Sequence, residues 1–518
     1  MLLTEIADVS SAVAGTTSRT AKLELLRDVL ERLADVELSV GIALLSGHPP
    51  QDRLEIGWAT SSRATAVPAA TPELELVEVD DAFEQIAALG GEGSAGQRGQ
   101  LLGELLGRAT EDEQDFLRNV LMRNVRKGAG RGLLLRALAN LADIDHDELR
   151  RAVAVSGDLA AVALVLRSDG PAAVTAIDLE VGVPFEPMLA LSTSVLDEAS
   201  IGTLTVVEQK LDGIRVQVHR DGEDVRIFTR NLNDVTHRMP ELVDIAVALP
   251  WRRAVLDGEA IVLDDAGRPV MFQESMQRFG TDETGPTGVP LTVRFFDVLS
   301  VDGQPVYRES FADRLEVLDR LPTELVVARI TTGDPEEARE FLRSTLEAGH
   351  EGVLLKDPTA PYEPGVRATS WRKHKPAHTL DLVVLAAEWG SGRRRGWLSN
   401  LHLGARDPDT GGFVMLGKTF KGLTDEMLTW QTERLKALET EPGPDHHVDR
   451  QRRPVFVKPE LVVEIAFDGL QASRRYPAGL ALRFARVRAH RPDKRPEDAD
   501  TIETVRAIFE GRRIPAVD

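Results

Sequence analysis

The sequence predicts a multidomain protein in which an all-α domain is followed by an α+β domain and then by a small β-barrel. The chain has 518 residues, and a single hydrophobic core rarely grows past about 250–300 residues. Leucines recur at helix spacing in the first third, alternating apolar and polar residues begin near Ile214, and short apolar runs separated by glycines follow His378. We therefore expect domains over residues 1–186, 187–377 and 378–518.

The first domain is predicted to be helical because its leucines share helix faces over residues 23–33, 101–106 and 133–141. The third of these helices follows a basic, glycine-rich loop that contains Arg126 and Lys127 and runs into Arg131. Backbone amides at a helix start, beside arginines, suit a DNA phosphate. A flexible surface loop is the alternative interpretation of this segment.

The second domain is predicted to mix strands and helices. A boundary rich in turn residues lies near residues 168–187, and two alternating runs then flank the turn at Asp221-Gly222. Later, Asp334 is placed to cap a helix that has Pro335 in its first turn and Gly349 after its end. Glu337, three residues after the cap, predicts a capping box.

The third domain is predicted to begin near residues 376–380 and to be a small barrel, for which an OB-fold, a barrel that binds nucleic acid, is the natural candidate. Its short strands are expected over residues 380–387, 401–405, 413–416 and 461–467, with one helix near 425–439.

Composition excludes several classes of protein. The chain has no cysteine, which removes disulfides, thiol nucleophiles and Cys-ligated zinc, so any metal is held by oxygen or histidine, as Mg²⁺ or Mn²⁺ is. No apolar run is long enough for a membrane span, and the N-terminus lacks a signal-peptide pattern, so we expect the chain in the cytoplasm. We also expect it to be a monomer. The net charge of −21 argues against a general nucleic-acid coat, although local basic clusters still permit DNA binding.

The segment Glu208–Arg215 carries the most specific chemistry. It reads as a buried strand, then Lys210, a glycine turn and a second strand with Arg215. A lysine amine is normally protonated at neutral pH, and neighbouring cations or partial burial are needed to make it a nucleophile toward a phosphate. A surface lysine before a β-turn is the alternative.

Two carboxylates in strand-like settings, Glu259 and Glu351, lie downstream. Carboxylates among apolar residues need a partner or a metal, and two of them near a nucleophilic lysine suit a divalent ion that bridges to a triphosphate. Phe296 belongs to a strand that either stacks on a base or lies in the core. Lys373 and Lys375 share one strand face, where they would neutralise a leaving phosphate or protect an exposed edge.

Taken in order, these segments resemble the signature motifs of covalent nucleotidyltransferases, and most closely those of ATP-dependent DNA ligases. The resemblance covers nearly the whole chain. The matching segments are 208–215, 229–231, 256–259, 295–297, 351–356, 367–375 and 482–488 with Asp493-Lys494. The helical first third is similar to the DNA-binding domain of that family, and Ala485 departs from the proline that many relatives carry.

The resemblance implies a role for each matching residue. Lys210 would carry AMP, and Asp212 would assist the final attack by a DNA 3′-hydroxyl. Glu208 would read adenine and Phe296 would stack on it. Glu259 and Glu351 would hold Mg²⁺ or Mn²⁺. The expected ligands of ribose and phosphate are Arg215, Arg230, Glu259, Arg367, Lys373 and Lys375, and those of pyrophosphate are Arg483, Arg486, Asp493 and Lys494.

The activity implied is ATP-dependent sealing of nicked duplex DNA. An RNA ligase or a capping guanylyltransferase shares the lysine motif, but the long helical first third argues against both. An NAD⁺-using ligase is disfavoured because that family carries a four-cysteine zinc site. A non-catalytic DNA-binding scaffold is the alternative from another class, and the intact Lys210, Glu259, Glu351 and Lys373 argue against it.

Overall fold

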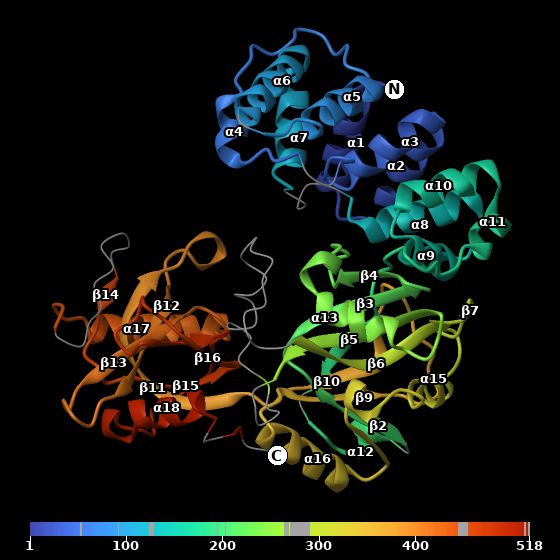
Figure 1. Cartoon of the computed structure of the whole chain (residues 1–518). Coiled ribbons are helices and arrows are strands. Elements are labelled where there is room, and N and C mark those ends of the chain that lie inside the picture. The colour runs from blue at the N-terminus through green and yellow to red at the C-terminus, as the bar shows by residue number, and fades with distance from the viewer. Residues whose placement is uncertain are drawn as a thin grey trace.

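The structure is a computed structural model of the whole chain. It describes residues 1–518 except 52–53, 92, 124–128, 194, 203, 264–268, 270–290, 444–453, 512–513 and 516–518. Figure 1 shows three parts in chain order: a helical domain, a central domain of strands and helices, and a C-terminal domain of strands. Among the described residues, no helix has the length and apolar character needed to cross a membrane.

The helical domain is all-α over its described residues, as predicted. Its helices are α1 (Leu3–Gly15), α2 (Arg19–Arg32), α3 (Asp35–Leu45), α4 (Trp58–Arg63), α5 (Leu76–Ala87), α6 (Ser94–Arg108), α7 (Glu111–Leu121), α8 (Arg131–Ala142), α9 (His146–Ser156), α10 (Leu159–Ser168) and α11 (Pro171–Ala176).

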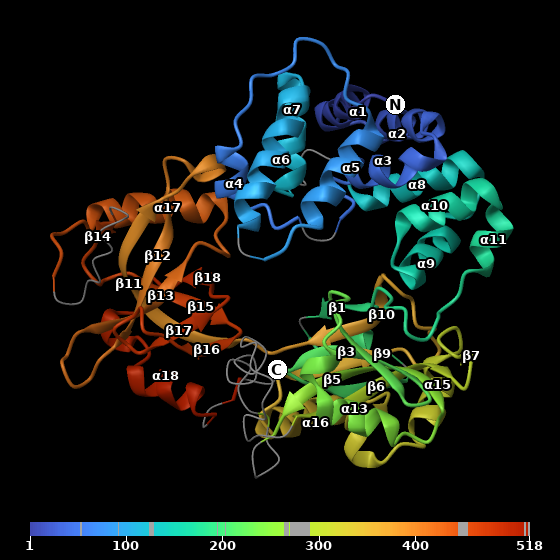
Figure 2. The same cartoon turned by 45° about the horizontal axis from the view of Figure 1, so that its top comes forward.

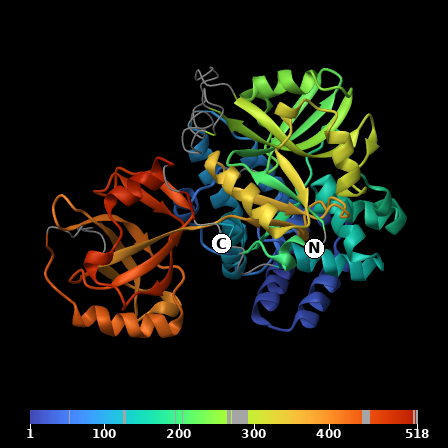
Figure 3. The same cartoon turned by 90° about the horizontal axis from the view of Figure 1, so that it is seen from below.

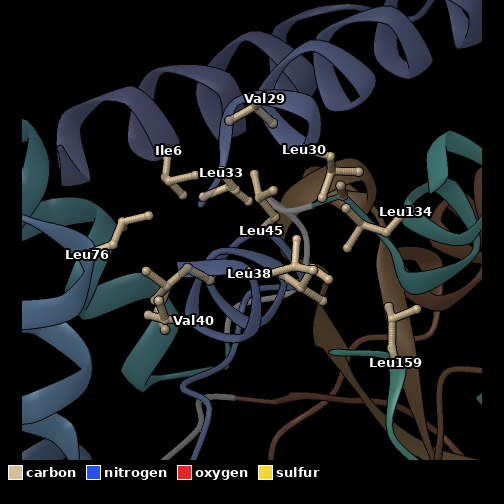
Figure 4. Packing of buried hydrophobic residues seen from close by; sticks show 14 of the residues in the cluster. Ile6, Val29, Leu30, Leu33, Leu38, Val40, Leu45, Leu76, Leu134 and Leu159 are labelled. Carbon is tan, nitrogen blue, oxygen red and sulfur yellow. The ribbon is translucent and has the colours of Figure 1, made fainter. Parts of the chain in front are cut away.

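One hydrophobic core holds these helices together. In Figure 4, Ile6 of α1, Leu30 of α2, Leu38 of α3 and Leu134 of α8 gather in the same core region. Each of them is fully shielded from water. Truncating such a leucine to alanine typically costs about 2–5 kcal/mol, so this core contributes strongly to the stability of the helical domain.

Over its described residues, the central domain contains two five-stranded sheets. One has the strand order β1-β10-β9-β2-β8 and the other β4-β3-β5-β6-β7. The strands are β1 (Leu189–Thr193), β2 (Thr205–Lys210), β3 (Ile214–Asp221), β4 (Asp224–Thr229), β5 (Arg253–Val262), β6 (Leu291–Val301), β7 (Gln304–Pro305), β8 (Arg329–Thr332), β9 (Gly352–Lys356) and β10 (Arg367–His374). The helices are α12 (Glu198–Ile201), η2 (Thr236–Arg238), α13 (Pro240–Val247), α15 (Phe311–Leu318), η3 (Thr323–Leu325) and α16 (Pro335–Glu347).

The helix predicted from Asp334 is confirmed as α16, with Asp334 as its N-cap, Pro335 in the first turn and Gly349 at φ 88° after its end. The predicted capping box is wrong. Glu337 accepts a 2.5 Å hydrogen bond from the Thr332 hydroxyl, and the Asp334 amide donates to the same hydroxyl oxygen at 2.9 Å. The Thr332 hydroxyl at the end of β8 therefore bonds both groups that would pair in a capping box, which are the Glu337 carboxylate and the Asp334 amide.

The C-terminal domain is mainly antiparallel, with a sheet of order β13-β12-β11-β15-β18, β14 paired to β11, and the separate pair β16-β17. Its strands are β11 (His378–Trp389), β12 (Leu398–Arg406), β13 (Phe413–Thr419), β14 (Val455–Phe456), β15 (Val462–Phe467), β16 (Gly469–Ala472), β17 (Leu480–Arg483) and β18 (Arg486–His490). Its helices are η4 (Gly392–Arg394), α17 (Asp425–Ala437), η5 (Pro496–Asp498) and α18 (Ile502–Phe509).

The connections between the domains differ. Figure 2 shows α9 of the helical domain next to the central domain, and Val155 of α9 packs into a core cluster of that domain with Phe185 and Met188. Figure 3 shows the C-terminal domain to one side of the other two. It is joined to the central domain by the short segment between His374, the last residue of β10, and His378, the first residue of β11.

Candidate active site

A cavity of about 830 Å³ lies in the central domain and is lined by strands of both sheets. Many of the residues singled out in the sequence line it. They are Glu208 and Lys210 of β2, Arg215 of β3, Arg230 after β4, Glu259 of β5, Phe296 of β6, and Arg367 and Lys373 of β10. The folded chain thus collects the separate sequence segments around one space.

Lys210 lies at the end of β2 beside the edge of this cavity. Its Nζ contacts one carboxylate oxygen of Glu351, and Lys375 Nζ lies 2.5 Å from the other. Strand register explains the meeting, because Lys210 pairs with Gly352 in the β2–β9 ladder and His374 pairs with Val353 in the β9–β10 ladder. The nucleophile candidate and two flanking charges therefore meet where three strands end.

Gly352 is required for this arrangement. Its φ is +152°, and a Cβ at this position would lie 2.3 Å from the His374 carbonyl oxygen. Any larger residue would push β9 away from β10, and Glu351 away from Lys375.

Glu259 flanks Lys210 from the other sheet. Its Oε1 accepts a hydrogen bond of 3.2 Å from the Gly213 amide. Burial raises the pKa of Glu259 to about 7, against the opposing fields of Lys210 and Arg215. Burial would also raise the pKa of Glu351, but Lys210 and Lys375 outweigh it and hold that pKa below its ordinary value. The two carboxylates thus differ in how readily they ionise.

Asp212 lies in the turn after Lys210. Burial raises its pKa, the neighbouring Glu351 charge adds to this, and Lys210, Lys375 and Arg483 oppose it. Arg483 ends β17 in the C-terminal domain, so the electrostatic field of that domain reaches the central site.

Arg215 is more deeply held than the sequence suggested. Its guanidinium forms a two-pronged ion pair with Asp257 at 2.9 and 2.6 Å, and it donates to the Met188 carbonyl at 2.7 Å. Tyr362 donates a 2.8 Å hydrogen bond to the same carboxylate. Arg215 also lies 5.4 Å from the ring centre of Phe296. It therefore lines the cavity as a fixed part of the wall.

Glu208 has a buried partner as well. Lys356 Nζ lies 2.7 Å from Glu208 Oε2, and both side chains are almost fully shielded from water. Burial raises the pKa of Glu208, and Lys356 opposes that shift. The pair lies beside Phe296 and Trp371, whose rings meet edge to face with centres 6.1 Å apart.

A cationic rim surrounds Lys210. Arg230 and Arg367 are exposed at the cavity, and Lys373 is partly buried. Burial lowers the pKa of Lys373, and the positive charges of Lys210, Arg367 and Arg230 lower it further. These groups are close enough to repel one another, so an anion such as a phosphate would relieve the repulsion.

The structure does not bring the whole last motif to the cavity. Arg486 pairs with Asp468 at 2.9 Å, and Lys494 pairs with Asp381 of β11. Asp493 pairs with Arg491 at 2.7 Å, and the hydrogen bond from Arg491 lowers the pKa of Asp493 to about 2. Arg486, Asp493 and Lys494 thus form ion pairs within the C-terminal domain and do not line the cavity.

Of the loop expected to contact DNA, Arg126 and Lys127 lie outside the described residues. Arg131 begins α8 and forms an ion pair with Glu186, which lies in the segment between α11 and β1. Burial lowers its pKa.

Sequence reasoning gave no role to Asp257, Tyr362, Lys356 or Trp371, although three of them lie within motifs already recognised. Asp257 and Glu259 are two residues apart on β5, so alternation alone predicts that they share a face. Lys356, a charged residue at the end of an apolar strand, was a visible sign of a buried partner.

The described residues contain no group of three or more His, Asp or Glu side chains able to hold a metal by themselves. Glu259 and Glu351 nevertheless offer hard oxygen ligands on either side of Lys210. That set fits Mg²⁺, which usually takes one or two carboxylates and completes its shell with water and substrate phosphates.

Comparison with known proteins gives consistent matches along the chain. Residues 56–139 match the DNA ligase N terminus family, residues 187–375 the ATP dependent DNA ligase domain, and residues 394–494 the ATP dependent DNA ligase C terminal region. A probable DNA ligase of Anaeromyxobacter dehalogenans strain 2CP-1 is 51% identical over 99% of this chain and 100% of its own length. A probable DNA ligase of Mycobacterium sp. strain KMS is 49% identical over 98% of this chain and 100% of its own length.

The solved structure named Pmar-Lig_PreS3 is similar in fold, with a TM-score of 0.61 and 18% identity over 94% of this chain and 99% of that one. The three family matches lie in chain order, and both relatives align with almost the whole of this chain. The chain belongs to the ATP-dependent DNA ligase family.

Proposed function

We propose that this chain seals nicks in duplex DNA with Lys210 as the residue that carries AMP. The supporting observation is that Lys210 Nζ lies beside a phosphate-compatible cationic rim and in contact with Glu351, at the edge of a cavity large enough for a nucleotide. The Lys210 amine attacks the α-phosphorus of ATP. A P–N bond forms, the bond to the β-phosphate oxygen breaks, and pyrophosphate leaves.

Two displacements follow. An oxygen of the 5′-phosphate at the nick attacks the same phosphorus, so the P–N bond breaks and AMP is joined to the DNA through a phosphoanhydride. The DNA 3′-hydroxyl then attacks the 5′-phosphorus, a phosphodiester forms, and AMP leaves. Asp212 accepts the hydroxyl proton in this step, a role supported by its place in the turn after Lys210 and its raised pKa.

The remaining residues bind and orient. Glu208 contacts the adenine edge and Phe296 packs on its face, while Arg215, Arg230 and Glu259 hold the ribose and the α-phosphate. Arg367, Lys373 and Lys375 neutralise the phosphates. Their positions around one cavity support these roles, apart from Lys375, which acts from beside Glu351.

Glu259 and Glu351 would hold Mg²⁺ or Mn²⁺, a cation that neutralises charge on the triphosphate when bound. The pKa of Glu259, which burial raises to about 7, supports this assignment, because a carboxylate buried near Asp257 needs a cation to stay ionised.

The C-terminal domain contributes Arg483, Arg486, Asp493 and Lys494 to pyrophosphate orientation. Because Asp493 and Lys494 are paired within that domain, this role requires new contacts between the two domains during the reaction. We propose that the C-terminal domain is an OB-fold, and that the domains meet at residues 186/187 and 377/378. The helical domain binds the duplex through the loop with Arg126, Lys127 and Arg131.

The decisive experiment is an intact-mass measurement after incubation with ATP and Mg²⁺. The wild-type chain gains the mass of one AMP, and Lys210→Ala does not. Lys458→Ala, at an exposed lysine outside the cavity, is the matched control and gains AMP normally. Uptake of label from α-labelled ATP by a folded Lys210→Ala protein would refute the mechanism.

A further inference from the structure

Glu208 is an unusual wall residue because its charge is buried and only half satisfied. Its Oε2 lies 2.7 Å from Lys356 Nζ, while its Oε1 is shielded from water and has no hydrogen-bond partner in the described part of the chain. An unpaired buried carboxylate oxygen is costly. At the wall of a nucleotide-sized cavity, it is an acceptor that awaits a donor from a ligand.

Lys356 is held as firmly as the carboxylate it contacts. Its Nζ donates a 2.8 Å hydrogen bond to the Phe296 carbonyl oxygen. It also lies over three aromatic rings, 4.3 Å from the centre of Trp371, 4.4 Å from Phe311 and 4.9 Å from Phe296. Burial lowers the pKa of Lys356, and the carboxylates of Glu208 and Asp297 oppose that shift. The ring faces also attract the ammonium, so these groups together stabilise its charged form against the cost of burial.

The other charges near this pair have partners of their own. Asp297 of β6 is held by Arg314 of α15 through contacts of 2.7 and 3.1 Å. Arg329 of β8 pairs with Asp319. Among the described residues, Lys356 of β9 is therefore the cation in direct contact with Glu208 of β2.

We propose that Lys356 is a positioning residue that sets the base specificity of the cavity, an inference that rests on the proposed function. It holds Glu208 as an ionised carboxylate, which can only accept hydrogen bonds. The cavity then takes a purine whose edge presents a donor at this point, as the 6-amino group of adenine does. It rejects a purine that presents a carbonyl oxygen there, as guanine does.

The same ammonium links the base edge to the stacking ring. Lys356 contacts the side chain of Glu208 and the main chain of Phe296, so one residue fixes both the acceptor and the aromatic face. Since burial raises the pKa of Glu208 and Lys356 opposes this, removing the cation favours the protonated carboxyl. A protonated carboxyl both donates and accepts, and it can therefore pair with guanine.

The test compares label transfer to the enzyme from α-labelled ATP and α-labelled GTP, as kcat/KM, between pH 6 and 9. The wild type prefers ATP at every pH. Lys356→Met, which keeps the length of the side chain but not its charge, loses about 10- to 100-fold of that preference. Its preference returns as pH rises, because Glu208 ionises again. Lys356→Arg keeps the charge and the wild-type ratio.

A folded Lys356→Met protein with the wild-type ratio and a flat pH dependence would overturn the inference. Circular dichroism shows whether that variant folds. If it does not, the double variant Glu208→Gln with Lys356→Met is used for the test, because it removes both charges of the buried pair. It should use GTP within about tenfold of ATP, since an amide both donates and accepts, and full wild-type discrimination in it would overturn the inference equally. Lys210→Ala, which abolishes labelling with both nucleotides, tests the proposed function separately.

Discussion

The buried ion pair between Arg215 and Asp257 allows a quantitative prediction. The Asp257 side chain is fully shielded from water, that of Arg215 is 15% exposed, and the carboxylate also accepts a hydrogen bond from Tyr362. Asp257→Asn keeps the shape but removes the charge, which leaves the buried guanidinium without its counter-ion. Breaking a buried pair in this way costs about 3–5 kcal/mol.

For a domain of this size, 1 kcal/mol shifts the melting temperature by roughly 2–4 °C, so Asp257→Asn should lower it by roughly 6–20 °C. The assay is scanning calorimetry, in which the transition of the central domain is identified as the one that ATP raises. The control is Glu336→Gln, which removes the exposed helical pair with Arg339 and is expected to cost about 0.3–0.5 kcal/mol. If Asp257→Asn lowers the transition no further than this control does, the assignment of Arg215 as a structural wall residue is wrong.

Two further predictions concern pH and salt. Because burial raises the pKa of Glu259 to about 7, the folded chain binds an extra proton between the ordinary glutamate range and pH 7. The stability that Glu259 contributes is therefore present at acid pH and lost as pH rises through 7. Without ATP or metal, the melting temperature of the wild type should fall relative to that of Glu259→Gln between pH 5 and 8, and parallel curves would contradict this. Replacing Arg126, Lys127 and Arg131 together should weaken binding to nicked DNA and reduce the slope of log K against log salt by about 2–3. An unchanged slope would mean that this segment is only a surface loop.

Sequence patterns predicted the parts of the fold that depend on local periodicity. Helix α16, the turn at Gly222 and the four strands expected in the C-terminal domain, which are β11, β12, β13 and β15, follow from spacing, caps and turn residues within a few positions. The capping box at Glu337 was wrong because Thr332, on the preceding strand, competes for both of its hydrogen bonds. Local rules fail where a neighbouring element supplies a better partner.

The site was predictable where motifs carry complementary charges, and less so where a partner is set by which strands are neighbours in a sheet. Lys210 and Glu351 were expected to act together, and they are in contact although 141 positions apart. The partnerships of Glu208 with Lys356 and of Arg215 with Tyr362 depend on which strands are neighbours and in what register, which no single segment encodes. The pairing of Lys494 with Asp381 likewise depends on the closure of a sheet far from the cavity.

The link to the C-terminal domain has a mechanical consequence. Lys375, Pro376 and Ala377 are all that separate β10 from β11, and Lys375 is also the residue whose ammonium holds Glu351 beside Lys210. If the C-terminal domain rotates by changing the backbone of these three residues, the Lys375 ammonium moves relative to Glu351 and Lys210. The orientation of the C-terminal domain and the electrostatic environment of Lys210 are thus coupled through the side chain of Lys375.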